Sequence, residues 1–399
     1  MNIREIIKGV HYVGVNDRVT EKFEALWPLP LGVSYNSYIV KGSDKIALLD
    51  TAHIDEVREY IAGIERAVEG REIDYLVVHH MEPDHSGSIV QVLQRWPNMK
   101  IIGNNQTIGM IKGFYHIDDS DRYLEVKDGT EIDLGGISLK FVLTPMVHWP
   151  ETMMTYVKEI KTLFSGDGFG TFGALNGAVV DDEMDVADYW PEMYRYYSNI
   201  VGKYGKFVQR ALGTLSGVEL DYICSTHGPV WHREIAKVIG IYDRLSKYES
   251  EEGAVIVYSS MYGNTAEIAE EVARGLAEGG IKKIKIHNAG HSQMSDIISD
   301  AFRYKGLVVG SATYSMTLMP PIQAFLTAMS VREITGKVMG GFGGYTWARG
   351  PVRSAIEGFA AERGIELTGF IAMKQSIDDT VREEARALGL ELAGKILNS

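Results

Sequence analysis

Four side chains that can bind a metal ion fall within six consecutive residues, which read His-Met-Glu-Pro-Asp-His. They are His80, Glu82, Asp84 and His85. The segment follows a predicted strand, Tyr75–His79, and precedes a predicted helix, so its side chains can converge on one point. Pro83 stiffens the turn between the two carboxylates. This spacing predicts that residues 80–85 form part of a metal site.

Three further candidate ligands lie downstream, namely His148, Asp167 and His227. His148 and Asp167 each follow an apolar, strand-like run, and the end of a strand is where a rigid scaffold can hold a ligand. The full set comprises four imidazoles and three carboxylates. One zinc ion needs only three or four ligands, so this set suits two metal ions, with one carboxylate bridging and positions open for substrate. Imidazole combined with carboxylate favours iron or manganese.

A second group of residues lies between an apolar run and a predicted helix, and it comprises Ser259, Ser260, Met261, Tyr262, Gly263, Asn264 and Thr265. Small hydroxyl residues and a glycine at a helix N-terminus form a cradle for a phosphate. The lysine of a triphosphate-binding loop is missing, which disfavours a nucleotide triphosphatase. The segment resembles the phosphate loop of flavodoxins.

Two more loops follow predicted strands at their carboxyl ends, where a flavin ring would lie. They comprise Ser311, Ala312, Thr313 and Tyr314, and then Gly343, Gly344, Tyr345, Thr346 and Trp347. Tyr314 and Trp347 are expected to stack on the ring, and loop N–H groups to bond its polar edge, so we predict bound FMN. The Gly168–Gly173 segment matches GxGxxG, but no βαβ unit follows, so we interpret it as flexible backbone around the metal site.

The elements that position these residues fall into two predicted domains, 1–250 and 251–399, separated by the polar run at 246–253. In the second domain, strand-like runs alternate with helical patterns and predict a doubly wound, five-stranded parallel sheet. The predicted strands are Ala254–Tyr258, Lys283–His287, Leu307–Gly310, Lys337–Gly340 and Leu367–Met373.

The first domain mixes short strands with helices, and its strands cluster at both ends of the region. The predicted strands are Tyr38–Lys41, Ile46–Leu49, Leu76–His79, Ile101–Gly103, Ile137–Leu143 and Thr162–Ser165, and the predicted helices are Glu56–Ala67 and Ser88–Trp96. This order favours an α/β sandwich of two sheets over a simple βαβ repeat.

Composition narrows the class of protein. The 399 residues carry a formal net charge of -13, which disfavours a nucleic-acid surface. The single cysteine, Cys224, permits neither an intramolecular disulfide nor a CxxC site for zinc or a fused rubredoxin. A reducing, cytoplasmic location is therefore expected. No secretory signal and no apolar run of about 20 residues is found, so we expect no membrane association.

The combined pattern resembles the flavodiiron proteins, or A-type flavoproteins, over nearly the whole chain. Zinc hydrolases of the same fold carry HxHxDH, whereas this sequence has Glu82 at the second histidine position, which favours iron. The resemblance implies an N-terminal metallo-β-lactamase-like αββα sandwich with two iron ions and a C-terminal flavodoxin-like domain with FMN. It implies that His80, Glu82 and His148 bind one iron, that Asp84, His85 and His227 bind the other, and that Asp167 bridges them.

The resemblance also implies an activity, reduction of O₂ to water, of NO to N₂O, or both. Electrons would pass through FMN from an external donor, a rubredoxin or reduced deazaflavin (F420). The chain would form a head-to-tail homodimer or a dimer of dimers. Some members have a histidine near the irons, and its place in this sequence is expected at Pro30 or Leu31. Tyr196 and Tyr197 are expected to line the substrate pocket, although a structural role fits the pair equally well.

Two other functions are compatible with the sequence. The first is a two-zinc hydrolase with an appended flavodoxin domain, which Glu82 disfavours. The second is a flavodoxin-type electron carrier with a vestigial metal domain, which the complete ligand set disfavours. Iron content distinguishes all three possibilities.

Overall fold

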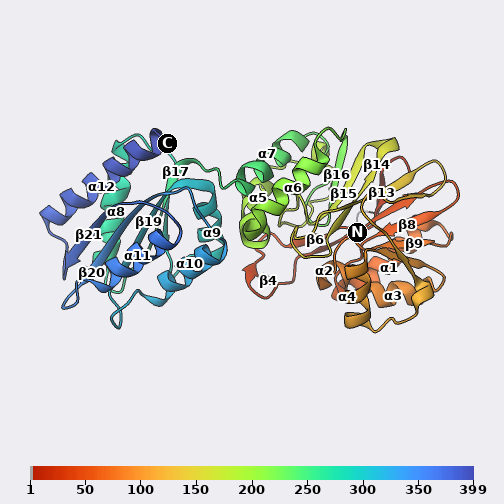
Figure 1. Cartoon of the computed structure of the whole chain (residues 1–399), viewed down its shortest axis with the longest axis horizontal. Helices are drawn as coiled ribbons and strands as arrows, with labels where there is room; N and C mark the ends of the chain where they lie inside the picture. The colour runs from red at the N-terminus through yellow and green to blue at the C-terminus, as the bar shows by residue number, and fades with distance from the viewer. Residues whose placement is uncertain (1–2) are drawn as a thin grey trace. The chain divides into compact units, whose positions relative to one another are not determined.

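The computed structural model describes residues 3–399, which form two compact units, one ending at Asp243 and the other spanning Arg244–Ser399 (Figure 1). Among the described residues, no helix combines the length and the apolar character needed to cross a bilayer. The assignment of separate functions to residues 1–250 and 251–399 stays a prediction.

The first unit contains two large β-sheets. The seven-stranded sheet has the order β1 (Arg4–Ile7), β2 (Val10–Tyr12), β7 (Tyr38–Lys41), β8 (Ile46–Leu49), β9 (Tyr75–Val77), β10 (Lys100–Gly103) and β11 (Tyr123–Glu125). The five-stranded sheet has the order β12 (Glu131–Asp133), β13 (Ser138–Leu143), β14 (Met153–Val157), β15 (Thr162–Gly166) and β16 (Tyr222–Ser225). Strands β8 to β11 pair in parallel, as do β15 and β16, so their carboxyl ends can present side chains along one edge.

The core of this unit lies between the two sheets. Val40, Leu49 and Val77 from the first sheet and Phe141 and Phe164 from the second are buried in one cluster. The outer faces carry helices, which are α1 (Val57–Val68), α3 (Ile89–Arg95) and α4 (Asn105–Tyr115) beside the seven-stranded sheet and α5 (Tyr189–Tyr196), α6 (Gly205–Leu215) and α7 (Ile235–Ser246) beside the five-stranded sheet (Figure 1). The predicted αββα sandwich is therefore confirmed.

The second unit is built on a five-stranded sheet in which every pair is parallel. Its order is β18 (Ile284–Asn288), β17 (Glu251–Ser259), β19 (Tyr304–Ala312), β20 (Val338–Tyr345) and β21 (Leu367–Lys374). Helices α8 (Asn264–Glu278) and α12 (Asp379–Leu397) cover one face, and α9 (Met294–Arg303), α10 (Pro320–Val331) and α11 (Pro351–Glu362) cover the other (Figure 1). The predicted doubly wound sheet is confirmed, and its 2-1-3-4-5 order is that of flavodoxin.

A buried lysine links three elements at one end of this unit. Lys337 donates hydrogen bonds to Ser250 Oγ at 2.7 Å and to the carbonyl oxygens of Phe302 at 3.0 Å and Tyr304 at 2.8 Å. Its side chain thereby joins the C-terminus of α9 to the start of β17 and of β19. Burial, with a smaller contribution from the neighbouring charge of Lys305, lowers the pKa of Lys337 from 10.5 to about 7.

This pKa predicts a pH-dependent stability for the second unit. Between pH 7 and 10.5 the unfolded chain holds a proton on Lys337 that the folded chain has lost, so the free energy of unfolding should rise with pH across this window. Lys337→Met should remove that contribution. The measurement is the urea midpoint of both proteins at several pH values, with unfolding monitored by the fluorescence of FMN as it is released. A difference between the two midpoints that stays constant with pH would contradict the prediction.

Candidate metal centre and flavin site

The predicted metal ligands follow strands of both sheets in the first unit. His80 and Glu82 lie between β9 and the short helix α2 (Pro83–Ser86), which carries Asp84 and His85. The remaining three follow strands of the five-stranded sheet, His148 after β13, Asp167 directly after β15 and His227 after β16. All seven side chains are buried, so the fold gathers them from distant parts of the sequence into one interior site.

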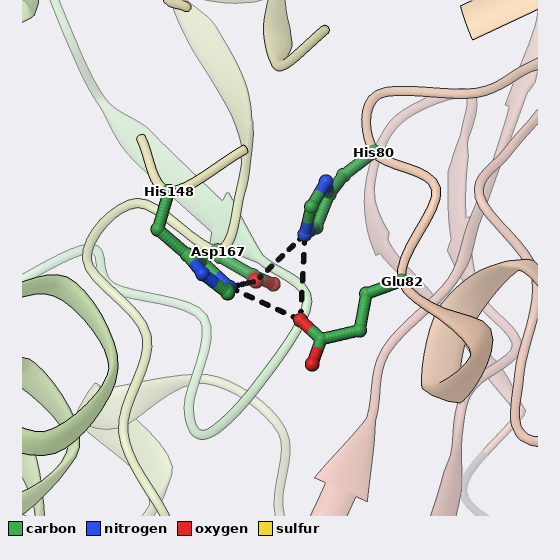
Figure 2. Close-up of side chains that lie close together, drawn as sticks. All are labelled: His80, Glu82, His148 and Asp167. Carbon is green, nitrogen blue, oxygen red and sulfur yellow. Dashed lines mark hydrogen bonds and ion pairs between the residues drawn. The ribbon is translucent and has the colours of Figure 1, made fainter. Parts of the chain in front are cut away.

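The first group consists of His80, Glu82, His148 and Asp167, whose side chains point toward one another (Figure 2). The Nε2 atom of His148 lies 3.0 Å from Glu82 Oε2 and 3.0 Å from Asp167 Oδ2. The Nε2 atom of His80 lies 3.4 Å from the same Glu82 oxygen and 3.7 Å from the same Asp167 oxygen. Two imidazoles and two carboxylates therefore enclose a single point.

The second group consists of Asp84, His85 and His227. The Nε2 atom of His227 lies 3.2 Å from Asp84 Oδ2, and that of His85 lies 3.6 Å from Asp84 Oδ1. The same two nitrogens lie 3.5 and 3.2 Å from Asp167 Oδ1. Asp167 therefore presents Oδ2 to the first group and Oδ1 to the second, and it lies between them.

Unpartnered polar atoms show that the second group fits a metal ion. Both carboxylate oxygens of Asp84, both ring nitrogens of His85 and Nε2 of His227 are buried without a hydrogen bond among the described residues. Buried polar atoms are nearly always paired, so these atoms are arranged for another partner. Imidazole and carboxylate donors in this arrangement suit iron or manganese.

The electrostatics of the site point the same way. Burial opposes charge on His85, but the carboxylates of Asp84 and Asp167 raise the pKa of its imidazole to about 10. Burial likewise opposes charge on Asp167 and Glu82, but the surrounding histidines lower the pKa of both carboxyls. The carboxylates thus form a strongly negative centre, and a bound cation would replace the protons that the imidazoles hold.

A carboxyl group that sequence reasoning missed lies beside the first group. Glu24 lies between the two-residue strands β4 (Lys22–Phe23) and β5 (Trp27–Pro28), where Trp27 Nε1 donates to its Oε2 at 2.9 Å. Glu24 is exposed in the single chain, but partial desolvation, followed by the charge of Glu82 and a hydrogen bond with it, raises its pKa to about 7. Pro30 and Leu31, the two expected places of the family histidine, are both exposed, and the Leu31 carbonyl accepts from Ala174 N.

The two predicted pocket tyrosines differ in their surroundings. The ring of Tyr196 lies 5.6 Å from that of His227, and its buried hydroxyl has no hydrogen bond among the described residues. Burial and then the charge of Asp167 raise its pKa well above the ordinary value. Tyr197 begins a π-helical turn, Tyr197–Val201, and its ring packs 5.0 Å from that of Tyr242. Tyr196 therefore contacts a predicted ligand, whereas Tyr197 packs against Tyr242.

The second unit contains a cavity of about 290 Å³ at the carboxyl ends of its strands. Residues of all three predicted flavin loops line it, namely Ser260, Met261, Tyr262, Asn264, Thr265, Ala312, Thr313, Gly344, Tyr345, Thr346 and Trp347. Ala348, Met373 and Gln375 also line it and were not predicted. Met373 and Gln375 could have been predicted, because β21 ends at the same edge of the sheet and ligands bind at the carboxyl ends of such strands.

Five residues of the predicted loops lie outside this lining: Ser259, Gly263, Ser311, Tyr314 and Gly343. The Ser311 hydroxyl accepts a hydrogen bond of 2.9 Å from the backbone N–H of Met319. Tyr314 exchanges two backbone hydrogen bonds with Thr317, each of 2.9 Å, in a turn outside the cavity. Gly263 shapes the phosphate loop rather than lining it, with φ of 97° immediately before α8.

The Gly168–Gly173 segment forms irregular backbone after β15, and the next α-helix, α5, begins only at Tyr189. It therefore lacks the helix that a dinucleotide site requires. Phe169 O accepts from Trp231 Nε1 at 3.0 Å, and Gly170 O accepts from Tyr242 at 3.0 Å, so the segment is fixed beside Asp167.

A β-lactamase-like sandwich with a buried cluster of metal ligands, joined to a flavodoxin-type sheet with a phosphate loop, defines a class of metal- and flavin-containing oxidoreductases. Family comparisons agree with this class. The family described as ODP family beta lactamase matches residues 33–228, and the family described as Flavodoxin matches residues 256–387.

Individual proteins show the family. The chain is 31% identical over 391 residues to an anaerobic nitric oxide reductase flavorubredoxin from Pectobacterium atrosepticum, an alignment covering 96% of this chain and 76% of that protein. Rubredoxin oxygen:oxidoreductase from Desulfovibrio gigas is 26% identical with a TM-score of 0.93, covering 100% of this chain and 99% of that chain. The flavodiiron protein from Giardia intestinalis is 26% identical with a TM-score of 0.94, covering 100% and 97%. The chain belongs to the flavodiiron protein family, whose cofactors are FMN and a di-iron site.

Proposed function

We propose that this chain reduces O₂ to water, NO to N₂O, or both, at two iron ions held by the two ligand groups. His80, Glu82 and His148 would hold one iron and Asp84, His85 and His227 the other, with Asp167 shared. The observation that carries the proposal is the position of Asp167, whose two oxygens face different groups at 3.0 to 3.7 Å and 3.2 to 3.5 Å. A carboxylate placed between two ligand groups in this way fits a pair of metal ions.

When bound, the irons would supply electrons and open positions for a diatomic gas, and FMN would supply electrons singly from an external donor. The protein's part is to hold the ligands rigidly and to exclude water. Phe23 and Tyr196 pack against His227, with ring centroids 5.5 and 5.6 Å from that of the imidazole, and Phe172 packs against both of them. The Tyr196 hydroxyl, which has no hydrogen bond among the described residues, could donate a hydrogen bond to the gas.

The names of similar proteins support both O₂ and NO as substrates. The flavorubredoxin relative is named for nitric oxide reduction, and the Desulfovibrio structure is named for the transfer of electrons from rubredoxin to oxygen. We propose a rubredoxin or reduced F420 as the donor for this chain as well.

In the second unit, the phosphate of FMN would lie at the N-terminus of α8, where Ser260, Asn264 and Thr265 face the cavity. Trp347 and Tyr262 would flank the flavin ring. They are 88% and 91% exposed in the single chain, and exposed apolar surface of this kind is typical of an interaction site. We therefore propose that a second copy of the chain covers this surface in a homodimer or a dimer of dimers, which sedimentation would test.

The test of the function begins with protein purified without air. About two irons and one FMN per chain, together with consumption of O₂ or NO when a donor is added, is the expected result. Comparing rubredoxin with reduced F420 identifies the donor. Two zinc ions and no gas consumption would favour the hydrolase, and bound FMN without any metal would favour an electron carrier.

The proposed role of Tyr196 predicts a difference between two neighbouring residues. Tyr196→Phe removes a buried hydroxyl that has no hydrogen bond among the described residues. Gas turnover should therefore fall about two- to tenfold, which is the effect of losing one hydrogen bond, with iron content unchanged. Tyr197→Phe is the matched comparison because its ring packs against Tyr242. Turnover at saturating donor is the measurement. An equal or larger loss for Tyr197→Phe would contradict the assignment.

A further inference from the structure

Glu151 is a fully buried carboxylate outside the set of proposed ligands. It lies three residues after His148, in the segment that joins β13 to β14. An unpaired charge is costly to bury, so a carboxylate in this position needs specific partners. Its partners identify what it does.

One oxygen of Glu151 bonds both to a ligand and to the backbone between two ligands. The Nδ1–H of His80 donates to Oε1 at 2.8 Å, and the backbone N–H of Met81 donates to the same oxygen at 2.9 Å. Burial opposes the negative charge, but these hydrogen bonds, chiefly that of His80, lower the pKa of Glu151. Because Nδ1 carries the proton, the Nε2 lone pair of His80 is left for a metal ion.

Two further contacts hold this arrangement rigid. Trp149 packs edge-on against the His80 ring, with centroids 5.0 Å apart and an interplanar angle of 84°. Asn104 Nδ2 donates to the Glu151 carbonyl at 2.6 Å, and Asn104 Oδ1 caps α4 by accepting from Gln106 N and Thr107 N. The backbone of Glu151 is therefore anchored to α4, and the ring of His80 contacts Glu151 on one side and Trp149 on another.

Two other histidines of the site, His227 and His85, have no carboxylate hydrogen-bonded to Nδ1 among the described residues. The Nδ1–H of His227 donates to the neutral carbonyl oxygen of Ser34 at 2.8 Å. Neither ring nitrogen of His85 has a hydrogen bond among the described residues. A carboxylate partner makes an imidazole a stronger donor to a metal than a carbonyl partner does. The two metal positions are thus electronically unequal.

We propose that Glu151 is a positioning residue that fixes the tautomer and orientation of His80 and, through its charge, stabilises the ferric state of the iron that His80 binds. This inference rests on the proposed di-iron function and assigns a role to a residue that touches neither substrate nor metal. It makes the iron of the first group the harder of the two to reduce.

Two variants separate orientation from charge. Glu151→Gln keeps an oxygen that can accept from His80 and Met81 but removes the charge, so the chain should retain two irons with a raised midpoint potential. A tenfold loss in the preference for ferric over ferrous iron corresponds to about 59 mV. Glu151→Ala removes the acceptor as well, so affinity for one of two Fe(II) ions should fall about 10- to 100-fold. The measurements are anaerobic Fe(II) titration of the metal-free full chain and EPR-monitored redox titration.

Asp181→Asn supplies the matched control. Asp181 is buried and accepts from the backbone N–H groups of His232, Arg233 and Glu234 at 2.8 to 3.0 Å, without contacting a proposed ligand. This variant should lower thermal stability and leave the potential unchanged. A potential in Glu151→Gln equal to that of the unaltered chain would overturn the role of the charge, and unchanged Fe(II) affinity in Glu151→Ala would overturn the role in positioning. Failure of the unaltered chain to bind iron would overturn the di-iron proposal itself, and this inference with it.

Discussion

Replacing Asp167 with alanine is expected to lower O₂ or NO turnover by more than about 100-fold. Mutating a residue that only hydrogen-bonds a metal ligand typically lowers metal affinity or activity about 10- to 100-fold, and Asp167 is itself a proposed ligand. Asp167 faces the Nε2 atoms of all four histidines at 3.0 to 3.7 Å. If Asp167 is shared as proposed, its removal would take one ligand oxygen from each of the two metal positions. Reduction of FMN by the donor should continue, because Asp167 belongs to the first unit and the flavin cavity to the second.

The measurement is iron content together with single-turnover kinetics of flavin reduction and gas consumption. Asp181→Ala is the control, since it also removes a buried carboxylate from the first unit. We expect it to reduce stability while keeping two irons and gas turnover. Gas turnover that survives in Asp167→Ala would show that the assigned centre is not the site of reduction.

The second large effect is expected in the phosphate loop, where Gly263→Ala should raise the dissociation constant of FMN about five- to thirtyfold. Gly263 has φ of 97° and ψ of -30°, and its N–H donates to Ser260 Oγ at 3.1 Å. A side chain in the left-handed region costs about 1–2 kcal/mol. The variant loop relieves this strain by moving, and FMN binding must then restore the original conformation.

Gly280 provides a control at the other end of the same helix. It has φ of 99°, and an added Cβ at Gly280 or at Gly263 would meet nothing closer than 3.7 Å. Gly280→Ala therefore introduces comparable backbone strain far from the flavin loops. It should lower stability without changing FMN affinity, which fluorescence titration of the FMN-free chain measures. Equal dissociation constants in the two variants would show that strain at Gly263 is irrelevant to binding.

The flavodoxin-type unit was predictable from sequence because its central strands are continuous apolar runs. Val255, Ile256 and Val257 in β17 and Val308 and Val309 in β19 are fully buried, as expected for parallel strands covered on both faces. Strand β14 was missed because its residues, Met-Met-Thr-Tyr-Val, show no distinctive alternation. It is specified by pairing with β13 and β15 on either side.

The seven candidate ligands could be selected from the sequence because His80–His85 is contiguous and because His148 and Asp167 follow apolar runs, and the fold brings them together. Glu24 and Glu151 could not be selected, for different physical reasons. Glu24 lies between two-residue strands and resembles any surface glutamate until the fold places it beside Glu82. Glu151 accepts a hydrogen bond from His80, which lies 71 residues away in the sequence, so the sequence gives no sign that the two side chains are in contact.

The origin of the ligands in both sheets has a consequence for the folding of the first unit. His80 follows β9 of the seven-stranded sheet, whereas Asp167 and His227 follow β15 and β16 of the five-stranded sheet. A metal ion bound to both sides therefore closes long loops of chain, as a disulfide does in a secreted protein. Cys224, the single cysteine, cannot form such an internal crosslink. Bonds between the ligands and the metal ions would crosslink the two sheets instead, so metal binding and folding of the sandwich become one coupled equilibrium.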